Sequence, residues 1–162
     1  MYESFELPQG SKPVVYAALA RHAEALVEGV NDKVANAANL AALLFHSLPK
    51  ISWSGFYFLH RKQLIVGPFQ GKPACVKIAL GRGVCGHAAA LRQPLLVGDV
   101  TSFPGHIYCD PDARSEIVLP LIKNDKLLGV LDLDAPIPDR FDEDDRRGLE
   151  KIAGIWIHSF TR

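Results

Sequence analysis

The sequence predicts an α+β fold in which helices pack on one face of a mainly antiparallel sheet. Three observations support this prediction. Two helix-like segments open the chain, a run of strand-like segments with one short helix among them fills its middle, and a last helical segment closes it. Separate groups of helices and strands are typical of antiparallel sheets, whereas a regular alternation of the two favours a parallel sheet. The 162 residues suit one domain, which we expect to span residues 1–162.

Two helices are expected first, from apolar spacing and from the residues at their ends. Residues 13–29 carry apolar side chains at helical intervals, with Pro13 in the first turn. Asn31 or Asp32 can cap a second helix. We expect this helix to end near Leu48, because a proline follows directly.

From Ile51 the apolar period changes to two, which indicates strands. The segment ISWSGFYFL places Trp53 and Tyr57 on one face, with Phe56 and Phe58 on the other. Further strands are expected near residues 63–69, paired with the first as a hairpin, and at 74–80 and 94–100. Between the last two, the Gly-rich segment GRGVCGHAAALRQ predicts a turn followed by a short helix.

An irregular stretch at 101–114 precedes the last two strands. SEIVLPLI and KLLGVLDLD are expected to pair as a hairpin across residues 123–125. The charged segment DEDDRR then opens a closing helix. Its apolar residues share one face: Leu149, Ile152, Ala153, Trp156 and Phe160. One face of the sheet must therefore meet the helices, and the other can carry a pocket.

Composition narrows the functional classes. The 18 basic and 18 acidic residues leave no positive surplus for a phosphate backbone, so we expect no nucleic-acid partner. No apolar run approaches the roughly 18 residues of a membrane helix. The short acidic start, broken by Pro and Gly, is unlike a secretory signal. These features predict a soluble, cytoplasmic protein with no membrane partner.

The three cysteines, Cys75, Cys85 and Cys109, are an odd number, which disfavours a structural disulfide framework. We expect no metal site, because the sequence has no C-x2-C pair and the cysteine spacings match no common zinc ligand set. Each cysteine alone is compatible with an inert, small apolar side chain. The more specific alternative is that one or more of these cysteines take part in redox or nucleophilic chemistry.

Two carboxylates stand side by side on the last strand. Asp132 and Asp134 are two residues apart and so share a face, where mutual repulsion and desolvation should raise at least one pKa. In the simpler interpretation the sheet ends at Leu131 and both side chains are solvated. A bound ammonium group would make the pair favourable.

Glu116 is a third candidate acid, and the strand register decides whether it joins the other two. A plain two-residue turn at residues 124–125 pairs Glu116 with Leu133, on the wrong face. A three-residue loop, or a bulge near Pro120, brings it to the face of Asp132 and Asp134. Cys109 lies seven residues before Glu116, so its loop can place it above the same end of the sheet.

Two other kinds of site are disfavoured. GRGVCG lacks the full spacing of a dinucleotide-binding loop, and no P-loop Lys-Ser/Thr follows it. A serine hydrolase would need a G-x-S-x-G elbow, and the sequence has none.

Several motifs together resemble a known family. They are WSGFYF, GRGVCGHAAALRQPLLVGDV, FPGHIYCDPDARSEIVLPL, GVLDLDAP and RFDEDD, combined with all three cysteines. From about Pro13 to Ile157 the chain resembles a GAF domain and, within that superfamily, the free methionine-(R)-sulfoxide reductases. The resemblance implies a six-stranded antiparallel sheet with the N- and C-terminal helices on one face and a ligand pocket on the other. It also implies a homodimer and a role in oxidative stress.

The resemblance further implies roles for individual residues. Cys109 corresponds to the nucleophile and Cys75 to the resolving cysteine, with Cys85 as the alternative resolver. The pocket acids correspond to Glu116, Asp132 and Asp134, and the aromatic wall to Trp53 and Tyr57. No bound cofactor is implied, and thioredoxin is the external reductant.

Chemistry agrees with these assignments. Sulfoxide reduction needs a thiolate to attack sulfur and an acid to protonate the departing oxygen. Three crowded carboxyls can keep one proton near neutral pH, and an ionised one can hold the substrate's ammonium group.

The competing interpretation is a GAF module that senses a cyclic nucleotide or a small metabolite. The signature of cyclic-nucleotide GAF domains survives only as Asn124, Lys126, Phe141 and Asp145, and Arg146 stands where its final glutamate should be.

Overall fold

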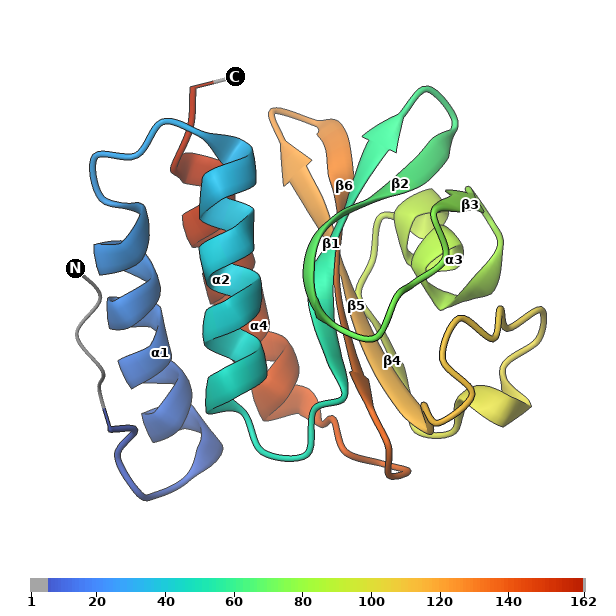
Figure 1. Cartoon of the computed structure of the whole chain (residues 1–162), viewed down its shortest axis with the longest axis horizontal. Coiled ribbons are helices and arrows are strands. Elements are labelled where there is room, and N and C mark those ends of the chain that lie inside the picture. Colours follow the sequence, from blue (N-terminus) through green and yellow to red (C-terminus); the bar gives the residue numbers. More distant parts are fainter. Residues whose placement is uncertain (1–5, 162) are drawn as a thin grey trace.

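The computed structural model describes residues 6–161 and contains one six-stranded antiparallel sheet with four α-helices (Figure 1). Along the chain the elements are α1 (Lys12–Val27), α2 (Lys33–Ser47), β1 (Trp53–His60), β2 (Gln63–Gly71), β3 (Lys77–Ala79), α3 (Gly83–Leu91), β4 (Leu95–Val97), the 3-10 helix η1 (Val100–Ser102), β5 (Ser115–Lys123), β6 (Lys126–Ala135) and α4 (Glu143–His158). The strand order is β3-β2-β1-β6-β5-β4. The predicted α+β class with a six-stranded antiparallel sheet is confirmed.

The helices divide between the two faces of the sheet. Figure 1 shows α1, α2 and α4 on one side, with α2 and α4 against the strands, and α3 on the other side. Two apolar clusters result, one on each face. The cluster under the helices includes Leu44, Phe56, Leu131 and Trp156. The cluster on the opposite face includes Trp53, Tyr57, Cys85, Val118 and Val130.

The helix ends follow the predicted signals. A proline lies in the first turn of α1. Of the two candidate caps for α2, the structure uses Asp32, whose side chain accepts hydrogen bonds from the backbone N–H groups of Val34 and Ala35, each at 2.9 Å. Asp142 and Asp145 form a capping box at the start of α4.

Two predicted strands are shorter than expected. The third comprises only residues 77–79, so Cys75 lies in the connection between β2 and β3 rather than on a strand. There it is bonded to Cys109, which draws this segment toward the loop after β4. The fourth strand ends at Val97, because the Asp99 side chain accepts from the Thr101 N–H at 2.9 Å and closes a turn into η1.

Within residues 6–161, none of the helices combines the length and the apolar character needed to cross a membrane.

Candidate functional site

A bulge in the β5–β6 hairpin sets the position of Glu116. The turn at Asn124 and Asp125 has two residues, both with positive φ, which is the arrangement that alone would pair Glu116 with Leu133. The register instead shifts between Leu121 and Ile122, directly after Pro120. Glu116 therefore lies opposite Asp134, as the predicted alternative with a bulge near Pro120 requires.

Gly129 makes this bulge compatible with the neighbouring strand. It has a φ of +157°, and an added Cβ would collide with the backbone carbonyl oxygen of Tyr57. A residue without a side chain is therefore required where β6 bends between β1 and β5.

Three neighbouring strands carry the acids and one aromatic residue in a row. Trp53 of β1 pairs with Asp134 of β6, and Asp134 pairs with Glu116 of β5. Asp132 lies two residues before Asp134 on the same face, opposite Gly55. Strand β6 continues to Ala135, so the alternative in which the sheet ends at Leu131 is wrong. Glu116 and Asp132 are buried, with exposed fractions of 6% and 5%.

These side chains line one pocket on the face opposite α1, α2 and α4. Its volume is about 40 Å³, which is room for a few water molecules. The lining residues are Trp53, Tyr57, Pro73, Ala74, Ile78, Gly83, Val84, Cys85, His106, Ile107, Cys109, Asp110, Ala113, Glu116, Asp132 and Asp134. Of the eight predicted site residues, only Cys75 is outside this lining.

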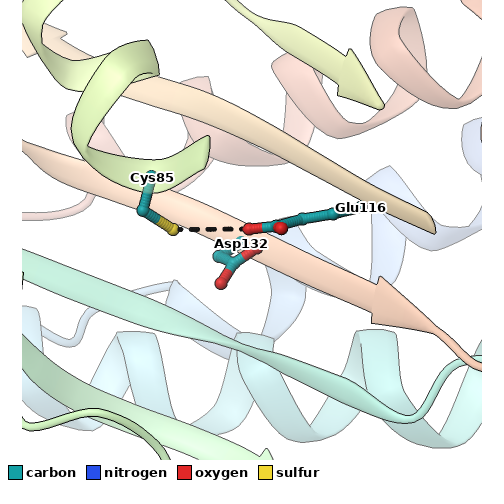
Figure 2. A group of neighbouring side chains, drawn as sticks. All are labelled: Cys85, Glu116 and Asp132. Atoms are coloured by element: carbon teal, nitrogen blue, oxygen red, sulfur yellow. Dashed lines mark hydrogen bonds between the residues drawn. The ribbon is translucent and has the colours of Figure 1, made fainter. Parts of the chain in front are cut away.

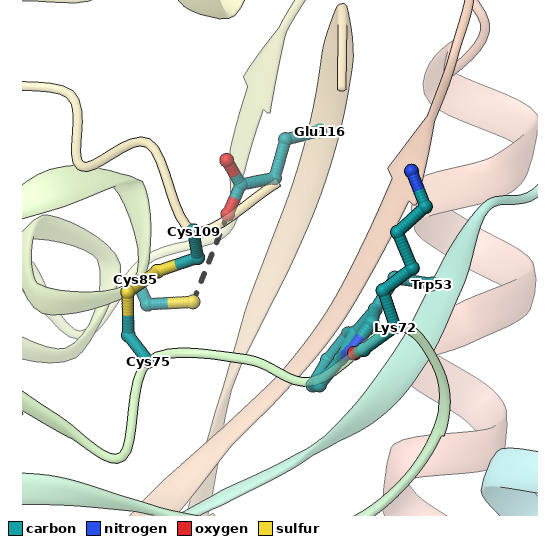
Figure 3. The surroundings of a disulfide bond; sticks show 6 residues. All are labelled: Trp53, Lys72, Cys75, Cys85, Cys109 and Glu116. Atoms are coloured by element: carbon teal, nitrogen blue, oxygen red, sulfur yellow. Dashed lines mark hydrogen bonds between the residues drawn. A yellow bond between two sulfur atoms is a disulfide. The ribbon is translucent and has the colours of Figure 1, made fainter. Parts of the chain in front are cut away.

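The three cysteines have different environments. Cys75 and Cys109 form a disulfide with a Cα–Cα distance of 5.4 Å, and both residues are half-buried (Figure 3). Cys109 lines the pocket, whereas Cys75 lies outside the lining and is bonded to Cys109. Cys85 is a buried free thiol on α3, and its Sγ donates a hydrogen bond to Glu116 Oε1 at 3.7 Å (Figure 2).

Burial gives the pocket acids unusual protonation behaviour. Desolvation raises the pKa of Glu116 well above its usual value, and the neighbouring carboxylates Asp132 and Asp134 raise it further. Desolvation raises the pKa of Asp132 to about 6, and the pKa of Asp134 is also raised well above normal, first by burial and then by Asp132. The pocket can therefore hold protonated carboxyl groups near neutral pH.

The aromatic wall is a stack of three rings. The Trp53 indole stacks on Tyr57 and on Phe69, with ring centroids 5.8 and 5.2 Å apart. Gly55 leaves the space for it, because an added Cβ would lie 2.6 Å from Trp53 Cη2. The indole Nε1 donates to the backbone oxygen of Lys72 at 3.1 Å, which fixes the ring at the edge of the site.

Two polar residues of the pocket were not predicted from the sequence. Asp110 follows Cys109, and its buried Oδ2 has no hydrogen-bond partner. Its Oδ1 lies 3.5 Å from Lys72 Nζ, so an ion pair joins the loop of Cys109 to the segment of Cys75. Among the described residues that line the pocket, His106 alone has a side chain that can carry a positive charge, and both of its ring nitrogens are buried without a hydrogen-bond partner. The only sequence signal for either residue was its place beside a candidate nucleophile in an irregular loop.

Cys85, Glu116 and Asp132 could also be considered as metal ligands, because their ligand atoms all lie within 4.8 Å of one another. A metal requires deprotonated thiol and carboxyl ligands. Burial instead raises the pKa of the Cys85 thiol, and the pKa of Glu116 is raised as well. Cys85 and Glu116 therefore fit a protonated, hydrogen-bonded pair better than they fit metal ligands.

Known proteins share both the sequence and the fold. The sequence profile of the GAF domain family matches residues 19–155. The free methionine-R-sulfoxide reductase of Escherichia coli strain K12 is 46% identical over 142 residues, which is 88% of this chain and 86% of the relative.

Two solved structures are similar over nearly their whole length. The free methionine-R-sulfoxide reductase from Neisseria meningitidis in complex with its substrate has a TM-score of 0.93 and 38% identity, over 97% of this chain and 95% of that one. The reduced form of fRMsr from Staphylococcus aureus has a TM-score of 0.87 and 48% identity, over 90% and 95% of the two chains. The chain therefore belongs to the GAF domain family and, within it, to the family of free methionine-R-sulfoxide reductases.

Proposed function

We propose that this protein reduces free L-methionine-(R)-sulfoxide to L-methionine, with Cys109 as the nucleophile. One observation carries the proposal: a half-buried cysteine, bonded to a second cysteine outside the pocket, lines the pocket that contains Glu116, Asp132 and Asp134. A sulfoxide reductase needs a nucleophilic sulfur and a proton donor at one site.

The first step uses the reduced protein. The Cys109 thiolate attacks the sulfoxide sulfur while a protonated carboxyl group delivers a proton to the oxygen. The oxygen is then transferred to the Cys109 sulfur: the sulfur–oxygen bond of the substrate and the new sulfur–sulfur bond break, which releases methionine and leaves a sulfenic acid on Cys109. Glu116 and Asp134 are the candidate proton donors, because both carboxyls have pKa values raised well above normal by burial.

The second step forms the disulfide. The Cys75 thiol attacks the sulfenic sulfur, water leaves, and the Cys75–Cys109 bond forms. The location of Cys75 outside the pocket supports this role, since it need not compete with substrate for space. Cys85 is the weaker candidate as resolver, because burial raises the pKa of its thiol and keeps it protonated.

The carboxyl groups also explain why the substrate would be free methionine sulfoxide and not a methionine sulfoxide within a peptide. The ammonium group of free methionine sulfoxide can neutralise an ionised acid in this pocket, and Asp132, with a pKa of about 6, is ionised at neutral pH. Trp53 and Tyr57 provide an apolar surface for the S-methyl end. A peptide-bonded methionine sulfoxide lacks the charge and carries chain on both sides of the residue.

Recycling requires a thiol reductant that supplies two electrons, for which we propose the dithiol protein thioredoxin. Two protein thiols are oxidised in each turnover, so two electrons must return to the Cys75–Cys109 bond. Other expectations remain predictions: a homodimer and a role in oxidative stress, from the family resemblance, and a cytoplasmic location, from the composition. Sedimentation of the purified protein tests the first of these.

The test is a single turnover with reduced protein and no reductant. With the free R epimer, we expect about one methionine released and about two thiols lost per chain, which is the stoichiometry of one disulfide. With the S epimer, or with an R-sulfoxide within a peptide, we expect little methionine product and little loss of thiols. Equal turnover of the free and the peptide-bound sulfoxide would contradict the proposal.

A further inference from the structure

Two exposed apolar side chains flank the disulfide. Val76 is 60% exposed and follows Cys75, while Tyr108 is 65% exposed and precedes Cys109. Because the α-carbons of the two cysteines are only 5.4 Å apart, both side chains belong to the immediate surroundings of one bond. The nearest described ring contact of Tyr108 is an edge-on one with His106, with centroids 4.7 Å apart.

Exposure at these two positions differs from exposure elsewhere. Single exposed apolar residues are common on protein surfaces. The other large, exposed apolar residues among the described ones are isolated in this way. They are spread over the helices, the helix connections and strand β4: Val14, Val30, Val34, Leu91 and Leu96. Val76 and Tyr108 are the most exposed of the seven, and they lie at the one bond that must be attacked from outside in every cycle.

Access to that bond is compatible with a protein partner. Both cysteines are half-buried, so a thiolate that attacks their bond must approach close to the segments that carry Val76 and Tyr108. A small thiol would gain nothing from apolar neighbours, whereas a protein with its thiol in an apolar surface would bury Val76 and Tyr108 as it approaches.

We propose that Val76 and Tyr108 form the docking surface for a protein dithiol of the thioredoxin type, whose apolar surface around its reactive cysteine packs on them. The proposal rests on the disulfide cycle of the proposed function and adds the partner's binding surface to it. The partner's thiolate attacks one sulfur of the Cys75–Cys109 bond, forms a mixed disulfide and releases the other cysteine as a thiolate. The partner's second thiol then attacks the mixed disulfide. The partner leaves oxidised, and this protein regains two thiols.

The experiment compares two reductants on the same enzyme. A double variant, Val76→Thr with Tyr108→Gln, removes the apolar surface and substitutes no residue that lines the pocket. With thioredoxin, we expect its KM to rise at least about fivefold, as for loss of a central apolar contact. With dithiothreitol, the steady-state rate should stay within about twofold of the wild-type rate, because a small thiol needs no docking surface.

Two matched variants complete the design. Val34→Thr alters a side chain that is 49% exposed on α2, in the helical layer, and should leave the thioredoxin KM unchanged. Val76→Ile with Tyr108→Phe keeps an apolar surface and should retain a KM near that of the wild type.

The proposal is overturned if the Thr/Gln double variant uses thioredoxin with a wild-type KM, or if its rate with dithiothreitol falls equally. Reduction of the wild-type disulfide by glutathione but not by thioredoxin also overturns it. Failure of the proposed function appears separately, as wild-type reduced protein that releases no methionine in a single turnover.

Discussion

At the scale of single residues, the positions of the sulfur atoms predict which substitution stops the reaction. Cys109 lines the pocket, Cys75 lies outside it, and Cys85 is buried beside Glu116. We expect Cys109→Ser to release no methionine even in a single turnover, because no nucleophile remains. Cys75→Ser should release about one methionine per chain and then stall or slow, since the first step is intact. Rapid quenching with quantitation of methionine measures both.

Cys85→Ser is the matched control for these two variants. It should still give about one methionine per chain and lose about two thiols, because the Cys75–Cys109 pair is complete. A Cys75→Ser enzyme with full thioredoxin-dependent turnover would instead identify Cys85 as the resolver.

Asp132 should make the protein less stable as pH rises. Its folded-state pKa is about 6, above the ordinary 3.8, so the folded state holds the proton more tightly than the unfolded state does. Below about pH 4 both states are protonated and no penalty exists. Between pH 4 and 6 the free energy of unfolding should fall, by about 1.4 kcal/mol per unit of pKa difference, and above that range the full penalty remains.

Urea unfolding at several pH values, with the disulfide intact, measures this effect. Asp132→Asn should remove the part of this fall that Asp132 contributes, and Glu116 and Asp134, whose pKa values are also raised, should keep the rest. The variant should also weaken substrate binding at pH 7. Asp112→Asn, at an exposed position, should leave the fall unchanged. A steeper fall in Asp132→Asn would show that the carboxyl group is not the source of the penalty.

The individual site residues were predictable to different degrees. Strand periodicity alone places Trp53 with Tyr57 and Asp132 with Asp134, because side chains two or four positions apart share a face. Asp110 and His106 lie in the irregular loop that carries Cys109, where no period applies. Their direction depends on tertiary contacts, such as the ion pair between Asp110 and Lys72.

At the scale of elements, the bulge in the β5–β6 hairpin decides whether the acids meet. The sequence allowed two registers, and the choice between them depends on how β6 fits between β1 and β5. Gly129 is the residue that permits the fit. We expect Gly129→Ala to reduce the free energy of unfolding by about 2 kcal/mol or more, because its Cβ would collide with the Tyr57 carbonyl.

Gly154→Ala is the control for this substitution. Gly154 lies within α4, and nothing would lie within 4 Å of an added Cβ, so the change should be neutral or stabilising by up to about 1 kcal/mol. Urea unfolding compares the two variants. Equal stability of Gly129→Ala and the wild type would mean that the bulge relaxes without cost.

The helices and the β1–β2 and β5–β6 hairpins could be predicted because capping residues, apolar periods and turns agree locally. The third and fourth strands could not be placed so well. Each has only three residues, and their lengths are set by contacts that the local sequence does not encode, including the Cys75–Cys109 bond beside β3.

At the scale of the whole molecule, the redox state should change the stability of the fold. The disulfide joins residues 34 positions apart in sequence. Closing a loop of this length in the unfolded chain contributes about 3–4 kcal/mol to the stability of the oxidised protein, by the chain-entropy estimate. Urea unfolding of oxidised and reduced protein should show this difference, and Cys75→Ser should show none. A reduced protein as stable as the oxidised one would mean that the disulfide contributes nothing net to the stability of the fold.

The sheet separates two apolar clusters that serve different needs. The cluster beneath α2 and α4 contains no residue of the reaction pocket, whereas the opposite cluster contains Trp53, Tyr57 and Cys85. In the proposed cycle, making and breaking the Cys75–Cys109 bond requires the loops above the second cluster to rearrange, while the first cluster can stay packed throughout. Amide hydrogen exchange beneath the helices should be slow in both redox states and should differ between them only by the change in global stability. The loop amides should also differ through local opening.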